Sequence, residues 1–241
     1  MEKRLAMKEK VIDTFNQLAI VYEKSIDTEG LYNSEYERPT MLEQLPKDLL
    51  HKDVLDAGCA AGWYTHQLVN RGAKVIATDV SPEMIRTTQR RVGDKAKVIC
   101  MDLEGEMAFE ENSFDIIISS LTLHYVKDWE VTFNEFKRIL KPNGMLLFSV
   151  HHPFTDLRLL QNASYFSTEL ITDVWKKDGK TYEVPFYRRP LHTILNTTLK
   201  YFSIEKVIEP QPTLNFKERA PEKYEHLLKN PQFLIIKAIS K

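Results

Sequence analysis

The chain has 241 residues, of which 43% are apolar, and its formal net charge is −1. This length suffices for one large core with an insertion, and the scattered, near-neutral charge lacks the basic surface expected of a nucleic-acid partner. The two cysteines, Cys59 and Cys100, are too few for a disulfide framework and lack the partners of a zinc site, so we expect no metal. The first ten residues are too charged for a signal peptide, and no apolar run approaches the ~18 residues of a membrane span. These features predict a cytoplasmic protein without a membrane partner.

The first 50 residues predict a helical cap rather than part of a sheet. An apolar stripe lies at helical spacing on one face, at Val11, Phe15, Leu18 and Tyr22. Residues 39–45 predict a second short helix that ends at Pro46. We expect the cap to cover the sheet edge or the mouth of its crevice, with Tyr22 and Tyr32 as candidate substrate contacts. A packing helix without ligand contact explains the stripe equally well.

Residues 51–241 predict a single α/β domain. Seven short apolar runs have the composition of strands: Val54–Ala57, Lys74–Thr78, Lys97–Met101, Phe114–Ser119, Met145–Val150, Tyr201–Ile208 and Phe233–Ser240. Helical stretches separate them, with capping signals at Ser81 before Pro82 and at Asp128. Strands that alternate with helices predict a Rossmann-like, doubly wound parallel sheet covered on both faces.

The segment 151–190 is an insertion between the fifth and sixth strands. Residues 170–175 and 181–188 are rich in β-branched and aromatic side chains, and they flank Asp178-Gly179, a strong hairpin-turn signal. We therefore expect a β-hairpin, followed by a helix over residues 191–200. The insertion carries six aromatic side chains that could form a wall: Tyr165, Phe166, Trp175, Tyr182, Phe186 and Tyr187.

This insertion is the expected source of substrate specificity, as a lid over the acceptor. Trp175 and Tyr187 are the candidate aromatic contacts, and Arg188 and Arg189 are candidates to hold a carboxylate or phosphate of the acceptor. The alternative is a solvent-exposed hairpin whose aromatic side chains pack on the sheet edge and whose arginines are solvated.

The stretch VLDAGCAAGW, residues 54–63, ends a strand in very small side chains. After Asp56 and Ala57 come Gly58, Cys59, Ala60, Ala61 and Gly62. In an open parallel sheet, ligands bind at the carboxyl ends of the strands, where a helix N-terminus follows. Small side chains let a ligand approach the backbone N–H groups, so the loop predicts a ligand site.

The loop does not fit a dinucleotide. The G-x-G-x-x-G pattern requires glycine at positions 58, 60 and 63, where this chain has Gly58, Ala60 and Trp63. The negative charge of Asp56 would oppose a pyrophosphate and favours a cation. A ligand with a nucleoside at one end and a cationic amino-acid group at the other fits better, and an NAD-dependent oxidoreductase is the weaker alternative.

Acidic residues end the next two strands. Asp79 comes 17 residues after the end of the loop, where a carboxylate can accept hydrogen bonds from both hydroxyls of a ribose. Asp102 and Leu103 follow the third strand, where a carboxylate and a backbone N–H could bind an adenine edge. Val80 and Met84 would form an apolar wall for the ring. Each acid alone could be a helix cap, but acids at three successive strand ends favour a binding site.

Five stretches, in order, resemble the motifs of class I S-adenosylmethionine-dependent methyltransferases, in the type 11 branch of small-molecule enzymes: VLDAGCAAGWYT, VIATDVSPEMI, VICMDLE, FDIIISSLTLHYV and FKRILKPNGMLLFSV. The resemblance covers about residues 54–150. It implies a seven-stranded sheet whose last strand is antiparallel. It also implies S-adenosylmethionine as the cofactor, S-adenosylhomocysteine as its product, and a small-molecule acceptor.

The resemblance assigns a role to each motif residue. The implied contacts run along the cofactor from the adenine to the methionine: Asp102 and Leu103, then Asp79, then the Gly58–Gly62 loop, then Asp56 and Ser119. Asp56 would hold the methionine ammonium, and Ser119 would border the amino-acid tail. Ala60 stands where the family usually has a second glycine, so the loop must accommodate a Cβ there.

Methyl transfer from a sulfonium is an in-line displacement with an activated donor, so the enzyme mainly aligns the acceptor and excludes water. A base is needed only where the acceptor must lose a proton. His124, after the fourth strand, and His151 and His152, after the fifth, are candidate bases at the carboxyl edge. Each could instead be structural.

A non-catalytic protein that binds S-adenosylmethionine or S-adenosylhomocysteine is the main alternative function. A nucleic-acid methyltransferase is disfavoured because the Asn/Asp-Pro-Pro-aromatic run of amino-methylating enzymes is replaced by Ser119-Ser120-Leu121-Thr122. The sequence does not decide between a monomer and a homodimer.

Overall fold

The computed structural model describes residues 2–26, 30–160 and 164–241. Three stretches, Met1, 27–29 in the expected cap and 161–163 in the expected insertion, lie outside this description. The segments of the predicted cap and hairpin are otherwise covered.

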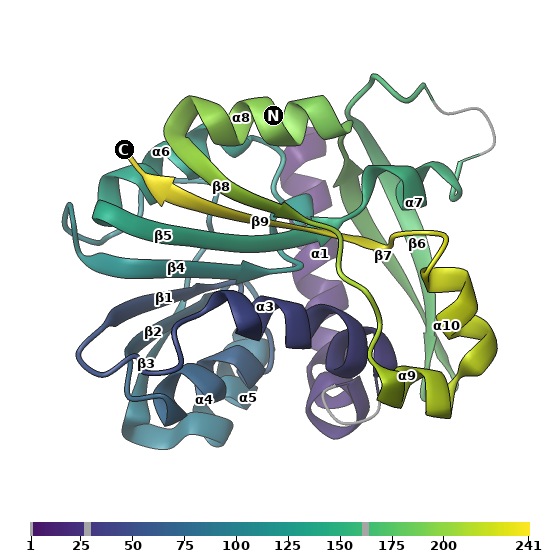
Figure 1. The fold of residues 1–241 in the computed structure, drawn as a ribbon, viewed down its shortest axis with the longest axis horizontal. Helices are drawn as coiled ribbons and strands as arrows, with labels where there is room; N and C mark the ends of the chain where they lie inside the picture. Colours follow the sequence, from purple (N-terminus) through teal and green to yellow (C-terminus); the bar gives the residue numbers. More distant parts are fainter. Residues whose placement is uncertain (1, 27–29, 161–163) are drawn as a thin grey trace.

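A seven-stranded sheet forms the centre of the fold, in the order β3-β2-β1-β4-β5-β9-β8 (Figure 1). The strands are β1 (Asp53–Ala57), β2 (Lys74–Asp79), β3 (Ala96–Cys100), β4 (Phe114–Ser120), β5 (Leu140–His151), β8 (Phe202–Ile208) and β9 (Phe233–Ser240). β1 to β5 pair in parallel, whereas β9 is antiparallel to both β5 and β8. This mostly parallel sheet with an antiparallel last strand confirms the predicted fold class.

β5 begins five residues earlier than the strand expected from Met145. Leu140 pairs with Phe114, and the next pair joins Met145 to Ile116, so residues 141–144 bulge out between the two pairs. The pair between Leu140 and Phe114 extends β5 over residues 140–144, which do not form an apolar run in the sequence.

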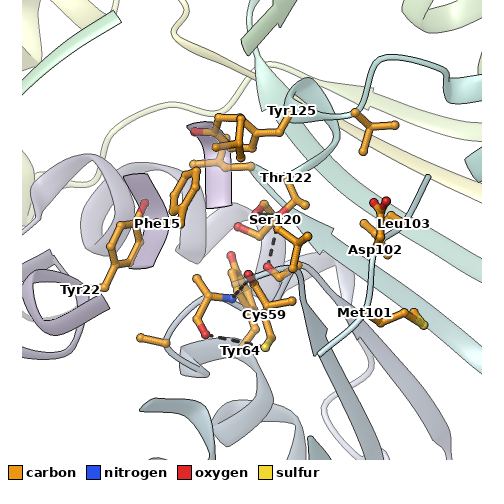
Figure 2. A pocket seen from close by; sticks show the side chains of 18 of the residues that line it. Phe15, Tyr22, Cys59, Tyr64, Met101, Asp102, Leu103, Ser120, Thr122 and Tyr125 are labelled. Carbon is orange, nitrogen blue, oxygen red and sulfur yellow. Dashed lines mark hydrogen bonds between the residues drawn. The ribbon is translucent and has the colours of Figure 1, made fainter. Parts of the chain in front are cut away.

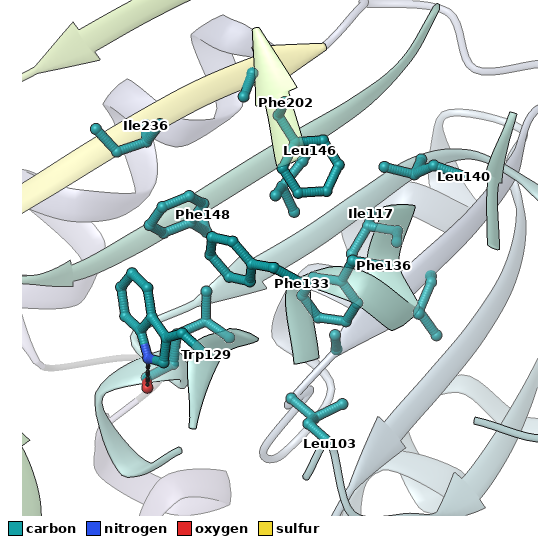
Figure 3. Close-up of a cluster of buried hydrophobic side chains, with 14 of the residues drawn as sticks. Leu103, Ile117, Trp129, Phe133, Phe136, Leu140, Leu146, Phe148, Phe202 and Ile236 are labelled. Carbon is teal, nitrogen blue, oxygen red and sulfur yellow. Dashed lines mark hydrogen bonds between the residues drawn. The ribbon is translucent and has the colours of Figure 1, made fainter. Parts of the chain in front are cut away.

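Side chains that alternate along the strands supply two hydrophobic layers, one on each face of the sheet. On one face, α6 (Trp129–Ile139) and α8 (Leu191–Tyr201) pack on the sheet, with Phe133 and Phe136 fully buried against Phe148 and Phe202 (Figure 3). On the other face, α3 (Arg38–Gln44) and α4 (Trp63–Asn70) cover the opposite side chains of the same strands. α5 (Pro82–Val92) lies beside α4 in Figure 1. This two-sided covering is the doubly wound arrangement that the alternation predicted.

Two helix caps form as their residue types predicted. The Ser81 hydroxyl accepts a hydrogen bond from the Met84 N–H at 3.2 Å and begins α5. Asp128 accepts from the Glu130 N–H at 3.0 Å and begins α6. Both caps satisfy an N–H that has no partner within the first helical turn.

The N-terminal segment forms a helical cap across the carboxyl edge of the sheet. It contains α1 (Glu2–Val21), the π-helical turns η1 (Tyr22–Ile26) and η2 (Asn33–Glu37), and then α3. Figure 1 shows α1, in purple, crossing the ends of the central strands, between the sheet and a hairpin. Asn16 on α1 accepts a hydrogen bond from the Ser81 hydroxyl at 2.7 Å, and Thr14 donates to the Glu183 carbonyl at 3.1 Å. α1 is therefore joined both to the sheet side and to the hairpin.

The expected hairpin is present as β6 (Glu169–Lys177) and β7 (Lys180–Arg188), with Asp178 and Gly179 in the turn. Several short elements were not anticipated: η3 (Gly93–Lys95), η4 (Leu123–Tyr125), α7 (Pro153–Leu157), α9 (Leu214–Arg219) and α10 (Pro221–Leu227). Across the described residues, none of the helices is long and apolar enough to cross a membrane.

Candidate active site

A cavity lies at the carboxyl edge of β1 to β4, beneath α1 (Figure 2). From the strand ends and their loops it is lined by Gly58, Cys59, Ala60, Ala61, Trp63, Tyr64, Asp79, Val80, Met101, Asp102, Leu103, Glu104, Ser120, Leu121, Thr122, Tyr125 and Val126. From the N-terminal cap it is lined by Met7, Lys8, Val11, Phe15, Tyr22, Asn33 and Arg38, and from β7 by Tyr187. This is the edge at which open α/β sheets bind ligands.

The glycines of the loop after β1 are required by the packing of the protein itself. Gly58 has a φ of +84°, and a Cβ there would lie 2.2 Å from the Cγ2 of Thr122. Gly62 has a φ of +77°, and its Cβ would lie 2.8 Å from the Cγ2 of Thr88. The space left by these two missing side chains therefore belongs to threonines, whereas Cys59, Ala60 and Ala61 face the cavity.

Ala60, where the family usually has glycine, adopts a left-handed conformation with a φ of 47°. This conformation is uncommon for a residue with a Cβ. The Ala60 N–H donates to Asp79 Oδ2 at 3.0 Å, and Thr88 Oγ1 donates to the Ala60 carbonyl at 2.7 Å. Two hydrogen bonds thus hold the loop in the shape that the alanine alone would disfavour.

Asp79 lies at the end of β2 with its carboxylate fixed in the cavity wall. Besides the bond from Ala60, Oδ1 accepts from the Ser81 N–H at 2.9 Å. Burial raises the pKa of Asp79 to about 6, although the hydrogen bonds from Ser81 and Ala60 oppose this shift. The carboxylate is therefore rigid, and it is ionised at neutral pH.

Asp56 does not occupy the position expected for it. Its side chain is 1% exposed and lies outside the cavity lining, with Oδ2 accepting from the Thr65 hydroxyl at 2.6 Å. Burial raises its pKa to about 7 against the hydrogen bonds from Thr65, and the charge of Asp79 adds to the rise. The structure therefore gives no support to a direct contact with a ligand ammonium, and Asp56 instead joins the end of β1 to the first turn of α4.

Asp102, Leu103 and Val80 lie together at the β3 end of the cavity, as expected. Asp102 accepts from the Glu104 N–H at 3.0 Å and forms an ion pair with Lys8 of α1. Two of the other expected cofactor contacts, Gly62 and Met84, lie outside the lining, because Gly62 packs on Thr88 and Met84 is fully buried against α1.

Ser119 is also outside the cavity, and its neighbour lines the cavity instead. The Ser119 hydroxyl is buried and donates to the Ala57 carbonyl at 2.8 Å. Successive side chains of a strand point to opposite faces, so Ser120 is the residue of β4 that lines the cavity. The expectation was displaced by one position.

None of the three candidate histidines lines the cavity. His124 is buried, stacks on His151 with ring centroids 4.1 Å apart, and has a pKa well below its usual value because of burial. His152 is buried beside Glu209, with Nε2 2.9 Å from Oε1, and burial lowers its pKa against that carboxylate. His124 packs instead against the ring of Tyr125, which does line the cavity. The structure therefore gives no support to a histidine base.

Of the six expected substrate contacts, Tyr22 and Tyr187 line the cavity, and the other four do not. Tyr32 packs on Phe216 with ring centroids 5.7 Å apart, and the Trp175 Nε1 donates to Asp173 at 2.8 Å.

The two arginines at the end of β7 hold backbone carbonyls rather than an acceptor. Arg188 is fully buried and donates to the carbonyls of Ser164, Tyr165 and Ser167 at 2.5–3.0 Å. Arg189 donates to the carbonyls of Val126, Lys127 and Tyr187 at 2.5–3.3 Å, and its guanidinium lies over the Trp129 ring. Both guanidinium groups are fixed within the fold, so the structure gives no support to their expected role in binding an anionic acceptor.

Sequence reasoning missed Lys8 and Arg38, and it placed Phe15 on the apolar stripe without assigning it to the site. Phe15 and Tyr125 meet edge to face, with centroids 5.0 Å apart, and Figure 2 shows both beside Tyr22 on one side of the cavity. Phe15 belonged to the predicted apolar stripe, which was a usable signal. No feature of the sequence pointed to Arg38, because only the fold brings this residue to the carboxyl edge of the sheet.

In the described stretches, no three His, Cys, Asp or Glu side chains are arranged to hold a metal ion.

Comparison with known proteins agrees with this fold. A family described as a methyltransferase domain matches residues 55–148. A solved structure from Listeria monocytogenes, assigned to the S-adenosylmethionine-dependent methyltransferases, is 30% identical, with a TM-score of 0.76, and the match covers 88% of this chain and 100% of that one. A second such structure, from Mesorhizobium loti, is 25% identical with a TM-score of 0.69 and covers 89% and 100%.

A curated relative, the malonyl-[acyl-carrier protein] O-methyltransferase of Methylovorus sp., is 32% identical, and the match covers 61% of this chain. The chain spans about half the length of that relative, 52%. A Haemophilus influenzae protein of uncharacterized function is 28% identical over 99% of this chain and 98% of its own length.

The chain belongs to the class I S-adenosylmethionine-dependent methyltransferases. Its cavity fits the cofactor of this family in the chemistry of its donors. A carboxylate at the β2 end suits a ribose diol, a carboxylate and backbone at the β3 end suit an adenine, and small residues after β1 leave room between them.

Proposed function

We propose that this protein transfers the methyl group of S-adenosylmethionine to a small-molecule acceptor in the cavity beneath α1. The observation that supports it most is the order of groups along the sheet edge. Asp102 and Leu103 at β3, Asp79 at β2, and the loop at β1 follow one another across adjacent strands. Adenine, ribose and sulfonium follow in the same order along the cofactor.

The cofactor, when bound, supplies a methyl carbon that is activated by its sulfonium sulfur. The chain's own residues then have to bind, align and exclude water. Asp79 would accept the ribose hydroxyls, because its carboxylate is already held by two backbone N–H groups. Leu103 and Val80 would pack on the adenine, and Asp102 would accept from its amino group. α1 covers the edge and would keep solvent from the reacting groups.

The acceptor would lie on the side of the cavity formed by Phe15, Tyr22 and Tyr125 (Figure 2). This side is aromatic, and the three candidate histidine bases are packed away from it. An acceptor there has to present a lone pair without help from a histidine, as a carboxylate does at neutral pH, whereas an aliphatic amine or a thiol must first lose its proton to solvent. A neutral alcohol is the least suitable acceptor.

A malonyl thioester is the second candidate acceptor, because several of the curated relatives are malonyl-[acyl-carrier protein] O-methyltransferases. Its free carboxylate meets the requirement for a lone pair. The expected anion-binding arginines of β7 are unsuited to it, since Arg188 and Arg189 are held by backbone carbonyls. Amines and thiols therefore stay in the acceptor panel beside the carboxylate.

Two measurements test the proposal. Calorimetry should show binding of S-adenosylhomocysteine and none of NADH, and binding of NADH alone would refute it. A panel of amines, thiols, carboxylates and phenols, with S-adenosylmethionine labelled in its methyl group, then tests catalysis. Label transferred to a member of the first three groups supports methyl transfer. Tight binding of S-adenosylhomocysteine without transfer to any compound would instead favour a non-catalytic binding protein.

A further inference from the structure

We propose that Phe15, Tyr22 and Tyr125 form an aromatic cage for a cationic head group, so that the acceptor is an amine and the methylated product is an ammonium ion. The inference rests on the proposed function and narrows its acceptor class. The three rings, called the aromatic cage, would contact the acceptor nitrogen and the methyl group that it receives.

The rings of the aromatic cage are adjacent walls that meet at steep angles. Phe15 is the middle wall, because its ring plane is inclined by 77° to that of Tyr125 and by 56° to that of Tyr22. The ring centroids are 5.0 Å and 6.3 Å apart in these two pairs. All three side chains line the cavity and are only partly buried, and Figure 2 shows them together on one side of it. Aromatic walls of this kind recognise methylated ammonium groups through cation–π attraction.

The aromatic cage lies beside the loop after β1, where the sulfonium region of the cofactor would lie. Its three rings pack in the same hydrophobic cluster as Ala60 and Ala61 of that loop, and both alanines line the cavity. The β3 end, proposed for the adenine, is two strands away from β1 in the sheet. The aromatic cage is therefore next to the position of the reacting methyl group rather than next to the nucleoside.

Carboxylates act on the aromatic cage. Burial raises the pKa of Tyr125 well above its usual value, and Tyr22, Asp173 and Asp156 add to the rise. Asp173 accepts a hydrogen bond from the Trp175 indole N–H at 2.8 Å, and Trp175 packs against the same cluster as the cage rings. Tyr125 therefore stays neutral, and the two carboxylates favour a positive group beside it. An anionic acceptor would meet both the negative ring faces and these charges.

The cations of the cavity lining lie away from the aromatic cage. Of the described residues that line the cavity, Lys8 and Arg38 are the cationic ones. Lys8 forms its ion pair with Asp102 at the β3 end. The guanidinium carbon of Arg38 lies 4.1 Å from the centre of the Trp63 ring, and Trp63 packs in the cluster beneath α4 rather than with the cage rings. Neither cation therefore occupies the place of an ammonium group in the cage.

Two further basic side chains lie just outside the lining. His124 contacts the Tyr125 ring with centroids 4.3 Å apart, and burial lowers its pKa well below the usual value, so it is uncharged at neutral pH. The guanidinium of Arg189 donates to the carbonyls of Val126 and Lys127 and lies 5.6 Å from the centre of the Tyr187 ring. Because Tyr187 already lies against a cation, we do not count it as a wall of the cage.

The reaction would move positive charge into the aromatic cage. The lone pair of the amine nitrogen forms a bond to the methyl carbon, the bond between that carbon and sulfur breaks, and its electron pair stays on sulfur. Positive charge thus passes from sulfur to nitrogen. A tertiary amine releases no proton in this step, and the proton that it carries in water is lost to solvent beforehand. Ring faces that attract a cation stabilise the charge as it forms on nitrogen.

The test compares three probes of similar size, each titrated by calorimetry into the protein saturated with S-adenosylhomocysteine. Choline carries a trimethylammonium group, 3,3-dimethyl-1-butanol is its neutral isostere, and 3,3-dimethylbutanoate carries a negative charge. We expect choline to bind roughly fivefold to thirtyfold more tightly than the alcohol, which is the range that cation–π contacts provide. The carboxylate should bind most weakly of the three.

Substitutions separate the ring faces from apolar bulk and from the hydroxyl groups. Phe15→Leu keeps an apolar side chain without a ring, so the affinity for choline should fall by about threefold to tenfold, whereas that for the alcohol should change by less than about twofold. Phe15→Tyr should keep the affinity for choline because the ring remains. Tyr125→Phe should keep it for the same reason, and Tyr125→Leu should lose it.

Phe154→Leu is the matched control. Phe154 is an aromatic residue of α7 that is 53% exposed, stacks on Tyr165 with ring centroids 5.6 Å apart, and lies outside the cavity lining. This variant should bind all three probes as the unchanged protein does. Urea unfolding checks that each variant is folded.

Four results would overturn the inference. Equal affinity for choline and the alcohol in the unchanged protein, or no binding of either, would refute the cage. An equal loss for both probes in Phe15→Leu would show that the ring only shapes the cavity. A loss in Tyr125→Phe as large as in Tyr125→Leu would assign the contact to the hydroxyl. Transfer of labelled methyl to carboxylates in preference to amines would refute the acceptor class and leave the proposed function intact. If the unchanged protein does not bind S-adenosylhomocysteine, the proposed function itself fails, which is a different outcome.

Discussion

Lys8 on α1 forms an ion pair with Asp102 at the end of β3, 94 positions further along the chain. Both residues line the cavity, so the ion pair links α1 to the β3 end of the cavity. Asp102 is also the residue expected to accept a hydrogen bond from the adenine. The cofactor and Lys8 therefore compete for the same carboxylate.

Lys8→Met should bind S-adenosylhomocysteine more tightly. Both members of the ion pair are about one-third exposed, at 36% and 34%, and pairs of this kind contribute about 0.2–1 kcal/mol. Release of Asp102 should therefore increase the affinity by up to about fivefold, measured by calorimetry at low salt. Added salt screens the pair, so it should strengthen binding in the unchanged protein and have little effect in the variant.

Lys10→Met is the control for this change. Lys10 lies on the same helix and forms an ion pair with Glu183 of the hairpin, outside the cavity lining. Its affinity should equal that of the unchanged protein. Weaker binding by Lys8→Met would show instead that Lys8 supports the cofactor, and the competition would be refuted.

The strand pattern could be predicted from the sequence because the central strands are local apolar runs that are covered on both faces. The caps at Ser81 and Asp128 are local too, and both formed. The bulge in β5 could not be predicted, because it depends on the pairing of Leu140 with Phe114 on another strand.

Site residues could be predicted from the sequence only where they lie at, or just after, the end of a single strand. Asp79 ends β2 and Asp102 lies two residues after β3, and both line the cavity. Ser119 and Asp56 lie outside the cavity lining, because the face to which a strand residue points depends on packing that a single apolar run does not reveal. The burial of Arg188 and Arg189 was missed for a related reason: burial of a guanidinium among carbonyls requires loops that are distant in the sequence.

The affinity for S-adenosylhomocysteine should increase as the pH rises from about 5 to about 8. Burial raises the pKa of Asp79 to about 6 and that of Asp56 to about 7, so both are protonated in acid. An ionised Asp79 accepts hydrogen bonds from the ribose more strongly, and binding should therefore release protons near pH 6. Calorimetry in buffers of different ionisation enthalpy measures this release, and an affinity that does not vary with pH would contradict it.

The same two acids should make the free protein less stable as the pH rises. A pKa raised by folding means that the folded chain holds protons that the unfolded chain has lost. The stabilising contribution is complete below about pH 4 and disappears as the pH passes through about 6 to 7. Asp79→Asn should flatten the part of the urea-unfolding profile near pH 6, and an unchanged profile would refute the assignment.

Replacement of His151 by Gln should leave kcat/KM within about threefold and its pH profile unchanged, once an acceptor is known. His151 lies outside the cavity lining, stacked on His124 and 3.4 Å from Asp156. A general base typically contributes a factor of about 10² to 10⁴. A loss of kcat/KM in that range, together with the disappearance of the acidic limb of the pH profile, would instead support His151 as the general base.

Asp115→Asn should lower the stability without affecting the cofactor site. Asp115 lies near the start of β4, beside the N-terminal end of β1 and at the sheet edge opposite to the cavity. Its carboxylate accepts hydrogen bonds from Lys141 Nζ at 2.7 Å, the Asp53 N–H at 3.0 Å and Lys52 Nζ at 3.1 Å. Burial would raise its pKa, but these hydrogen bonds outweigh burial and lower it to about 2. The variant should lose about 1–2 kcal/mol of the free energy of unfolding at pH 7.

Because the pKa of Asp115 is lowered by folding, its contribution is complete above about pH 4 and is lost as the pH falls towards about 2. The unchanged protein and Asp115→Asn should therefore converge in stability in that acid range. Urea unfolding at several pH values measures the convergence, and a constant difference down to pH 2 would refute it.

A crystal structure of the protein with S-adenosylhomocysteine tests the central claim most directly. We expect the ribose hydroxyls within about 3 Å of the Asp79 carboxylate and the adenine beside Leu103. A ligand bound outside the cavity beneath α1, or one whose ribose does not meet Asp79, would contradict it.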